Sequence, residues 1–179
     1  MMHFAGFEQR LEPVKPIIMI SVICPIYNEE KYIAKCIESI LEQDYPKDDL
    51  EVIFVDGMST DRTREIVAEY ANTYPFIRMV DNPDRIVPPA MNIGIRLAKG
   101  EIIIRLDAHA IFPSDYFSEL TKNLIELDAD NVGGVCRTLP VDDSVKSRSI
   151  AAVLSSSFGM GNSYFRIGAD SVREVDTVP

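Results

Sequence analysis

The sequence contains no tryptophan, two histidines and three cysteines. Cys24, Cys36 and Cys136 are scattered and form no C-x-x-C pair, so neither a zinc knuckle nor a disulfide framework is indicated. This cysteine usage fits a reducing, cytosolic compartment best. Because His3 and His109 are the only histidines and no G-x-S-x-G motif is present, a serine-hydrolase triad is poorly supported.

Basic residues are scarce relative to acidic ones. The chain has 28 acidic and 18 basic residues, which give a formal net charge of −10. We therefore expect no general binding to nucleic acid or to anionic lipid, although a divalent cation would still allow a phosphate ligand. The longest apolar stretch, residues 17–26, is broken by Ser21 and Pro25 and is shorter than the roughly 20 residues that cross a bilayer.

Familiar phosphate-binding motifs are also missing. There is no G-x-x-x-x-G-K-[ST] loop, and Gly159-Met160-Gly161 lacks the third glycine of a dinucleotide-binding fingerprint. The start of the chain has neither the basic residues nor the apolar core of a signal peptide. We predict a single domain over residues 18–179, preceded by an N-terminal extension over residues 1–17.

From about Ile18 onward, strand-like and helix-like patterns alternate. Apolar, β-branched runs predict strands over residues 19–24, 52–55, 76–80, 102–106 and around 131–136. Helical spacing between these runs predicts helices, one of which opens at Pro88-Pro89 and is expected to end at Gly100. This β-α-β-α order predicts an α/β fold with a mainly parallel sheet flanked by helices on both faces.

Polar residues follow three of the predicted strands, at the sheet edge where open parallel sheets bind ligands. They are Pro25-Ile26-Tyr27-Asn28-Glu29, Asp56 and Asp107-Ala108-His109. The Asp56 carboxylate would accept hydrogen bonds from a uracil or guanine edge, or would cap the next helix; the sequence favours neither. Tyr27 would stack on a base or pack at the rim, while Asn28 and Glu29 would contact the ligand or start a helix.

Asp107 and His109 form the sharpest of these features. With one residue between them in an extended segment, their side chains point to the same side. Together they would offer one oxygen and one nitrogen ligand, a pair that suits Mn²⁺ better than Ca²⁺. A metal site is favoured here over a structural histidine because of its position after an apolar strand.

At this point the residues resemble a known family. The segments 21–29, 55–61, 92–94 and 106–109 look like those of family 2 glycosyltransferases with the GT-A (nucleotide-diphospho-sugar transferase), Rossmann-like fold. The greatest likeness is to bacterial enzymes of succinoglycan and exopolysaccharide biosynthesis. The resemblance implies an inverting transfer from a nucleotide-diphosphate sugar, a UDP-sugar in the first place, to a polysaccharide or lipid-linked glycan.

The resemblance also implies roles for matching positions. The donor-binding residues would be Pro25, Tyr27, Asn28, Glu29, Asp56, Asn92, Asp107 and Ala108. Asp107 and His109, which occupy the D-x-D position, would bind Mn²⁺ or Mg²⁺. His109 departs from the usual aspartate, although polypeptide N-acetylgalactosaminyltransferases resemble this chain in using D-x-H.

Two further positions depart from the family pattern. Met91 stands where many members have a basic residue, so a donor contact made there would have to come from elsewhere, for example Arg85. Gly94 lies in a predicted helix, where glycine costs about 1 kcal/mol relative to alanine. We expect close approach of another backbone or of a ligand at Gly94.

The end of the sequence does not match the family's general base. Asp176 does not match that position, so we expect no catalytic residue within this chain, a base beyond Pro179, and a fragment without its acceptor part that is itself inactive.

Two alternatives stay open: a non-catalytic nucleotide-binding or oligomerising module, and a sugar-nucleotide nucleotidyltransferase. A homo-oligomer is also left open. The resemblance places the intact protein in the cytoplasm, at the inner face of a membrane through segments absent from this chain.

Overall fold

The computed structural model describes residues 18–161, 163–169 and 171–175. The expected extension over residues 1–17 lies outside the described residues, as does Asp176, which does not match the general base. Contacts group the chain into two compact units. The first contains residues 18–37 and 46–110, and the second contains residues 38–45 and the described residues from 111 onward. The prediction of a single domain over 18–179 is not tested by this grouping and stays a prediction.

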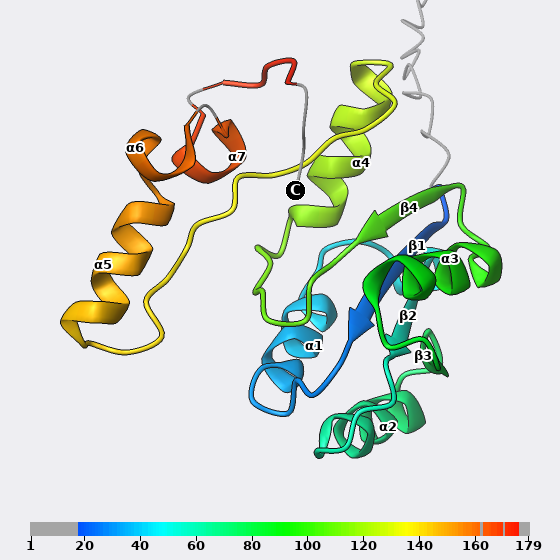
Figure 1. Cartoon of the computed structure of the whole chain (residues 1–179). Coiled ribbons are helices and arrows are strands. Elements are labelled where there is room, and N and C mark those ends of the chain that lie inside the picture. Colours follow the sequence, from blue (N-terminus) through cyan, green and yellow to red (C-terminus); the bar gives the residue numbers. More distant parts are fainter. Residues whose placement is uncertain (1–17, 162, 170, 176–179) are drawn as a thin grey trace, which may run out of the picture. The chain divides into compact units, whose positions relative to one another are not determined.

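The first unit is built on a four-stranded parallel sheet in the order β3-β2-β1-β4 (Figure 1). The strands are β1 (Ile20–Ile26), β2 (Leu50–Asp56), β3 (Ile77–Asp81) and β4 (Ile102–Arg105). Every residue of β2 is buried, as is nearly all of β1. This is the burial that continuous apolar runs predict for strands covered on both faces, and the predicted parallel sheet is confirmed.

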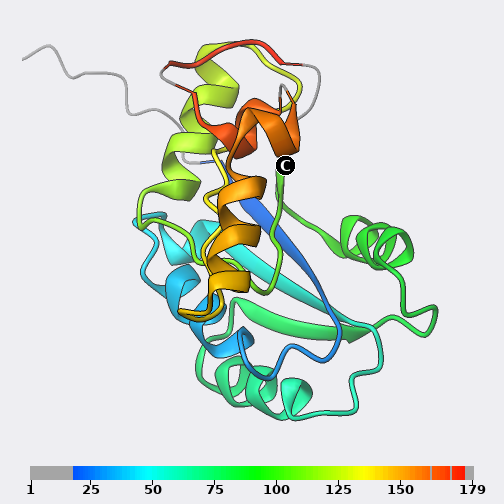
Figure 2. The same cartoon turned by 60° about the vertical axis from the view of Figure 1, so that its left-hand side comes forward.

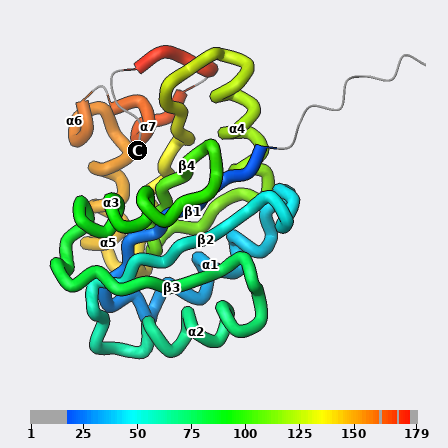
Figure 3. The backbone as a smooth tube through the Cα atoms, turned by 90° about the vertical axis from the view of Figure 1, so that its right-hand side faces the viewer, coloured from blue at the N-terminus to red at the C-terminus, as the bar shows by residue number. Residues whose placement is uncertain are grey.

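Three helices and a short 3₁₀ turn connect these strands: α1 (Ile33–Leu41), η1 (Lys47–Asp49), α2 (Thr63–Thr73) and α3 (Val87–Leu97). α2 packs along β3, and α3 packs across β1 and β2 (Figure 3). The strands step from β1 to β3 in one direction, and the chain then returns across the sheet to β4. The strand order therefore reverses between β1 and β4, which is where sheets of this type bind ligands.

Gly94 allows α3 to lie directly on the sheet. A Cβ atom at this position would lie 2.4 Å from Cγ2 of Ile23, a fully buried residue of β1. The expectation of close approach is therefore correct, but the neighbour is a side chain of the sheet, not a backbone or a ligand. A core cluster of Ile23, Ile53, Val55 and Ala90 fills the space between α3 and the sheet.

The predicted end of this helix at Gly100 is wrong. α3 ends at Leu97, and the Ala98 N–H donates to the Gly94 carbonyl at 2.9 Å. Gly100 instead lies against β1, where its N–H donates to Ser21 Oγ at 2.7 Å and an added Cβ would be 2.5 Å from the Ser21 nitrogen. Close backbone approach, not helix termination, explains this glycine.

The second unit contains four helices, of which the later three follow one another along the chain (Figure 2). They are α4 (Tyr116–Glu126), α5 (Val145–Leu154), α6 (Ser157–Met160) and α7 (Tyr164–Ile167). The buried Gln43 side chain fixes the start of α4, because its Oε1 accepts the Phe117 N–H at 3.0 Å and its Nε2 donates to the Pro113 carbonyl. Within the described part of the chain, no helix is both long and apolar enough to cross a membrane.

The fifth predicted strand, around residues 131–136, is wrong. These residues form neither helix nor strand. The Cys136 N–H donates to the Phe165 carbonyl in α7 at 2.6 Å, a partner outside any sheet. Gly133 and Gly134 also weaken a strand here, since glycine has no side chain to pack and loses more backbone entropy on ordering.

Candidate functional site

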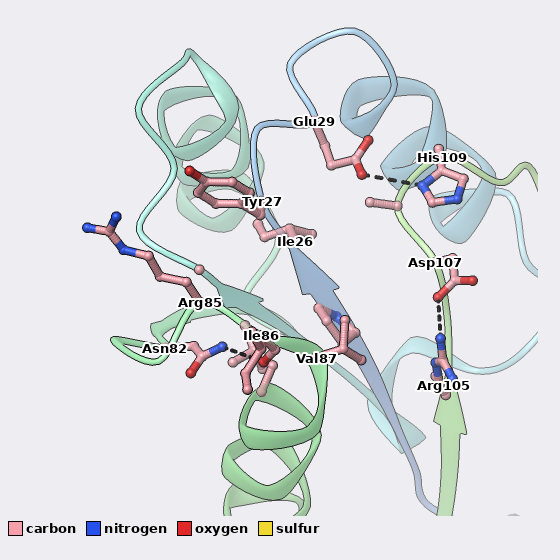
Figure 4. A pocket seen from close by; sticks show the side chains of 15 residues that line it. Ile26, Tyr27, Glu29, Asn82, Arg85, Ile86, Val87, Arg105, Asp107 and His109 are labelled. Carbon is pink, nitrogen blue, oxygen red and sulfur yellow. Dashed lines mark hydrogen bonds and ion pairs between the residues drawn. The ribbon is translucent and has the colours of Figure 1, made fainter.

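A pocket of about 270 Å³ opens in the first unit, beyond the carboxyl ends of β1 and β4 (Figure 4). This is close to the lower end of the ~300–1,000 Å³ typical of ligand pockets. Its lining comes from the loops after all four strands and from the start of α3. The lining residues are Pro25, Ile26, Tyr27, Glu29, Val55, Gly57, Asn82, Arg85, Ile86, Val87, Ala90, Arg105, Asp107, Ala108 and His109.

The pocket brings together most, but not all, of the residues that the sequence singled out. The predicted residues in its lining are Pro25, Tyr27, Glu29, Asp107, Ala108 and His109. Those outside the lining are Asn28, Asp56 and Asn92. In Figure 4 the lining has two ends: Tyr27 and Asn82 lie at one, and Asp107 and His109 lie across from them at the other.

Arg105, Asp107 and His109 form one edge of the pocket. Arg105 is the last residue of β4, and Asp107 and His109 belong to the turn that follows, in which the Ala110 N–H donates to the Asp107 carbonyl at 3.1 Å. The segment is therefore not the extended one that the sequence pattern predicts, although all three residues line the pocket. Arg105 Nη2 lies 3.0 Å from Asp107 Oδ1, and each of these side chains is about half exposed. The carboxylate is therefore held by one guanidinium and remains open to the pocket.

His109 is oriented by Glu29, which arrives from the loop after β1. Its Nδ1 lies 3.3 Å from Glu29 Oε1 (Figure 4). A carboxylate only accepts hydrogen bonds, so in the neutral imidazole this contact favours the proton on Nδ1 and leaves Nε2 as the nitrogen with a free lone pair. Histidines that bind metals usually have their second ring nitrogen fixed by a carboxylate in this way.

Asp56, at the end of β2, is completely buried. Its carboxylate accepts the Ser59 N–H and is also paired with Arg64, whose Nη1 reaches Asp81 Oδ1 at 2.7 Å. The carboxylates of Asp81 and Asp56 raise the pKa of the Arg64 guanidinium. The helix-capping alternative is not observed, because α2 begins only at Thr63.

Asn28 joins the loops after β1 and β2. Its backbone φ is +54°, which asparagine tolerates better than most residues. Its Oδ1 accepts the Thr60 N–H at 2.8 Å, and its own N–H donates to Ser59 Oγ at 2.9 Å. Asn92 is exposed on α3. In this structure Asn28 therefore shapes the rim of the pocket, and neither asparagine lines it.

Asn82, like Arg105, is a polar lining residue that the sequence analysis missed. It is 2% exposed, and its Nδ2 donates to the Ile86 carbonyl at 2.9 Å, while its Oδ1 is buried without a hydrogen-bond partner. The turn that follows holds Arg85 in the lining with a φ of +61°. Asn82 comes directly after β3, so the rule that drew attention to the other strand ends would also have found it.

Asp107 and His109 fit part of a divalent-metal site. They supply one oxygen and one nitrogen at the same end of the pocket, a donor set suited to Mn²⁺. Among the described residues, no three His, Cys, Asp or Glu side chains gather as a complete metal site. The side chains would therefore hold a cation only together with ligands from outside the chain, such as phosphate oxygens and water.

Known proteins are similar to this chain in sequence and in fold. The chain is 34% identical to the succinoglycan biosynthesis protein ExoA of Rhizobium meliloti over 150 residues, which is 83% of this chain. Its fold matches the mannosyltransferase PcManGT of Pyrobaculum calidifontis, solved with GDP-Man and Mn²⁺, at a TM-score of 0.59 and 34% identity. It also matches Staphylococcus aureus TarS, solved with UDP, at a TM-score of 0.57 and 29% identity. These structural matches cover 77% and 69% of this chain, and 40% and 38% of those chains.

The chain spans less than half the length of the curated relatives it matches. It covers 44% of ExoA and 47% of a glucuronosyltransferase of Methanococcus voltae. The likeness to solved glycosyltransferases confirms the predicted GT-A fold, and the likeness to ExoA confirms the resemblance to exopolysaccharide enzymes. The sequence pattern of Glycosyl transferase family 2 matches residues 21–172. Because that match covers most of the sequence, the chain belongs to glycosyl transferase family 2.

Proposed function

We propose that this chain is the donor-binding part of an inverting glycosyltransferase that takes its sugar from a nucleoside diphosphate, UDP in the first place. The observation that carries the proposal is a single pocket with two chemically different ends. One end has an aromatic ring and a buried acceptor, which suit a base; the other has a carboxylate, an imidazole and a guanidinium, which suit a metal and phosphates.

At the base end, Tyr27 and Asn82 supply the recognition. The Tyr27 ring is 47% exposed and free to stack on a planar base. The unpaired Asn82 Oδ1 is buried, so it would accept an N–H from the edge of that base after a local shift that exposes it. The new hydrogen bond would remove the penalty for a buried polar atom without a partner. Uracil and guanine both carry a suitable N–H. The UDP in the TarS structure favours uracil, and the GDP-Man of PcManGT keeps guanine as the second choice.

Asp56 would contact the base only after a local conformational change, because its side chain is fully buried and lies outside the pocket lining. Its bonds from Ser59 and Arg64 leave further acceptor capacity, since a carboxylate has about four lone-pair sites. A base that approaches past Gly57 would use one of them. The roles of Asn28 and Asn92 in donor binding stay predictions.

At the phosphate end, Asp107 and the unprotonated Nε2 of His109 would hold a divalent cation, Mn²⁺ or Mg²⁺. Such a cation, when bound, stabilises negative charge on a leaving nucleoside diphosphate. Glu29 keeps the imidazole in the required orientation, and Asp107 contributes a charged oxygen. The general base, the polysaccharide or lipid-linked acceptor, the oligomeric state and the compartment stay predictions.

Calorimetric titration of UDP and GDP into the chain, with and without Mn²⁺, tests this proposal. We expect Mn²⁺-dependent binding, with UDP preferred over GDP. Asp107→Ala and His109→Ala should each weaken that binding by about tenfold or more, because each removes a charged or metal-ligating group. Asp48→Ala, an exposed aspartate on η1, is the matched control and should bind like the wild type.

Binding that is independent of Mn²⁺ and insensitive to both site variants would overturn the metal assignment. Absence of binding by either nucleotide would overturn the donor-site assignment itself. Incubation of the chain with a sugar-1-phosphate and UTP distinguishes the nucleotidyltransferase alternative, because that class would form a sugar nucleotide and release pyrophosphate.

A further inference from the structure

The proposed function places the guanidinium of Arg105 at the phosphate end of the pocket but assigns it no specific contact. Arg105 is the last residue of β4, lines the phosphate end of the pocket and has a side chain that is 49% exposed. Its guanidinium pairs with Asp107, at 3.0 Å between Nη2 and Oδ1. The guanidinium is therefore held by the same carboxylate that would bind a divalent cation.

A guanidinium and a divalent cation compete for Asp107. Both are positive, and at the distances of a shared carboxylate their repulsion is several times stronger in a partly enclosed site than in bulk water. A cation bound to Asp107 would therefore weaken this pairing and favour release of Arg105, which contacts only Oδ1 of the carboxylate. The release costs little folding energy, because an ion pair between two half-exposed groups contributes little to stability.

The released guanidinium remains in the pocket. Arg105, Asp107 and His109 all line the end of the pocket where the phosphates of a donor would lie (Figure 4). A guanidinium binds phosphate oxygens through two parallel N–H donors, a geometry that an ammonium group lacks. The base end lies across the pocket from Arg105, which leaves the diphosphate as the negative part of the ligand within its reach.

We propose that Arg105 is a donor-binding residue with two partners: it pairs with Asp107 in the metal-free pocket and with a phosphate of the nucleoside diphosphate once a divalent cation occupies Asp107. This inference rests on the proposed function, since it takes the ligand to be a nucleoside diphosphate. It assigns opposite effects to one side chain, because Arg105 opposes binding of the metal alone and favours binding of the diphosphate with the metal.

Arg105→Gln separates these two effects. With Mn²⁺ alone, the variant should bind the ion a few-fold more tightly than the wild type, because the competitor for Asp107 is gone. With saturating Mn²⁺, its affinity for UDP should fall about tenfold, the effect expected for loss of a hydrogen bond between charged groups. Uridine, measured by NMR titration, should bind both proteins equally, because it lacks the phosphates.

Two further variants complete the test. Arg105→Lys keeps the charge and should bind UDP more tightly than Arg105→Gln does. Arg96→Gln changes an exposed arginine of α3 outside the pocket lining and should match the wild type in all three titrations. Thermal unfolding of each variant confirms that the fold is retained, as expected for exposed side chains.

The outcomes are distinct for the inference and for the proposed function. If the wild type binds UDP with Mn²⁺ and Arg105→Gln binds it equally well, the phosphate contact is overturned while the proposed function stands. Equal losses for UDP and uridine would also overturn it, because the defect would then lie at the base end. If the wild type binds no UDP, the proposed function fails and the phosphate contact fails with it.

Discussion

At the scale of single residues, Asn82 says most about the ligand. Its Nδ2 is bonded to the Ile86 carbonyl, whereas its Oδ1 is buried without a partner. Few buried polar atoms remain unpaired in folded proteins, and each one that does needs an explanation, such as a functional role or an ordered water. The orphaned oxygen is an acceptor, so the matching group on the ligand is an N–H donor such as the imide of uracil.

Asn82→Leu tests this assignment. The substitution keeps a side chain of similar volume but removes the acceptor, and we expect the affinities for UDP and uridine to fall equally, by about fivefold to tenfold. Ribose 5-phosphate, which has no base, should bind both proteins alike. Asp84→Ala, in the exposed part of the same turn, is the control. Unchanged uridine affinity would contradict a base contact at Asn82.

The sequence identified these residues unevenly. Asp107 and His109 were identified because the segment 107–109 directly follows an apolar strand, and position along a strand is visible in the sequence. The contact between Glu29 and His109 joins residues 80 positions apart, so no local pattern reveals it. The same holds for the burial of Asp56, whose pairing with Arg64 and Asp81 depends on how β2, β3 and α2 pack.

At the scale of elements, α3 shows packing that overrides helix propensity. Gly94 should weaken the helix by about 1 kcal/mol relative to alanine. However, an added Cβ would lie 2.4 Å from Ile23, which is buried among β-sheet residues and has little space to move. Propensity and packing therefore predict opposite signs for the same substitution.

We expect packing to dominate, so Gly94→Ala should lower the free energy of unfolding by about 1–3 kcal/mol, the usual cost of overpacking a core. Urea denaturation provides the measurement. Asn92→Ala, on the exposed side of the same helix, should change the free energy of unfolding by less than about 0.7 kcal/mol. A stabilised Gly94→Ala variant would show that α3 does not lie as close to β1 as described here.

Glu51 lies near the amino-terminal end of β2, at the end of the sheet opposite the pocket. Its carboxylate joins the loop before β4 to this end of the sheet. Burial by itself would raise the pKa of this carboxyl, but hydrogen bonds from Ser21 and the Lys99 N–H, together with Arg78, outweigh it and hold the pKa below its ordinary value. A lowered pKa means that the folded state favours the ionised carboxylate. Its stabilising contribution is therefore complete near neutral pH and is lost as the pH falls from the ordinary glutamate value, about 4.3, through the lowered one.

Glu51→Gln should lower the free energy of unfolding by about 1–3 kcal/mol at pH 7, because it removes an ionised acceptor from donors that remain buried. The difference from the wild type should shrink as the pH is lowered towards 3, where the wild-type carboxyl also loses its charge. Urea denaturation at several pH values measures this trend. A difference that stays constant from pH 7 to pH 3 would contradict a role for the charge.

At the scale of the whole molecule, the first unit was predicted well and the second poorly. Four strands and the helices between them were predicted because long apolar runs and helical spacing are strong local signals. The prediction of a fifth strand was wrong because Val132 and Val135 give a strand-like local pattern. In the structure the Cys136 N–H instead donates a hydrogen bond to a carbonyl in α7. Gly100 was misread for a similar reason, since its contact with Ser21 is non-local.

The central claim is that the pocket beyond β1 and β4 binds a nucleoside diphosphate with a divalent cation. Crystals of this chain grown with UDP and Mn²⁺ test it most directly, because the anomalous scattering of manganese locates the ion independently of the protein atoms. We predict an anomalous peak beside Asp107 Oδ and His109 Nε2, with the uracil ring against Tyr27 and its imide N–H directed at Asn82. A manganese peak away from Asp107 and His109, or a uracil ring bound outside this pocket, would contradict the account.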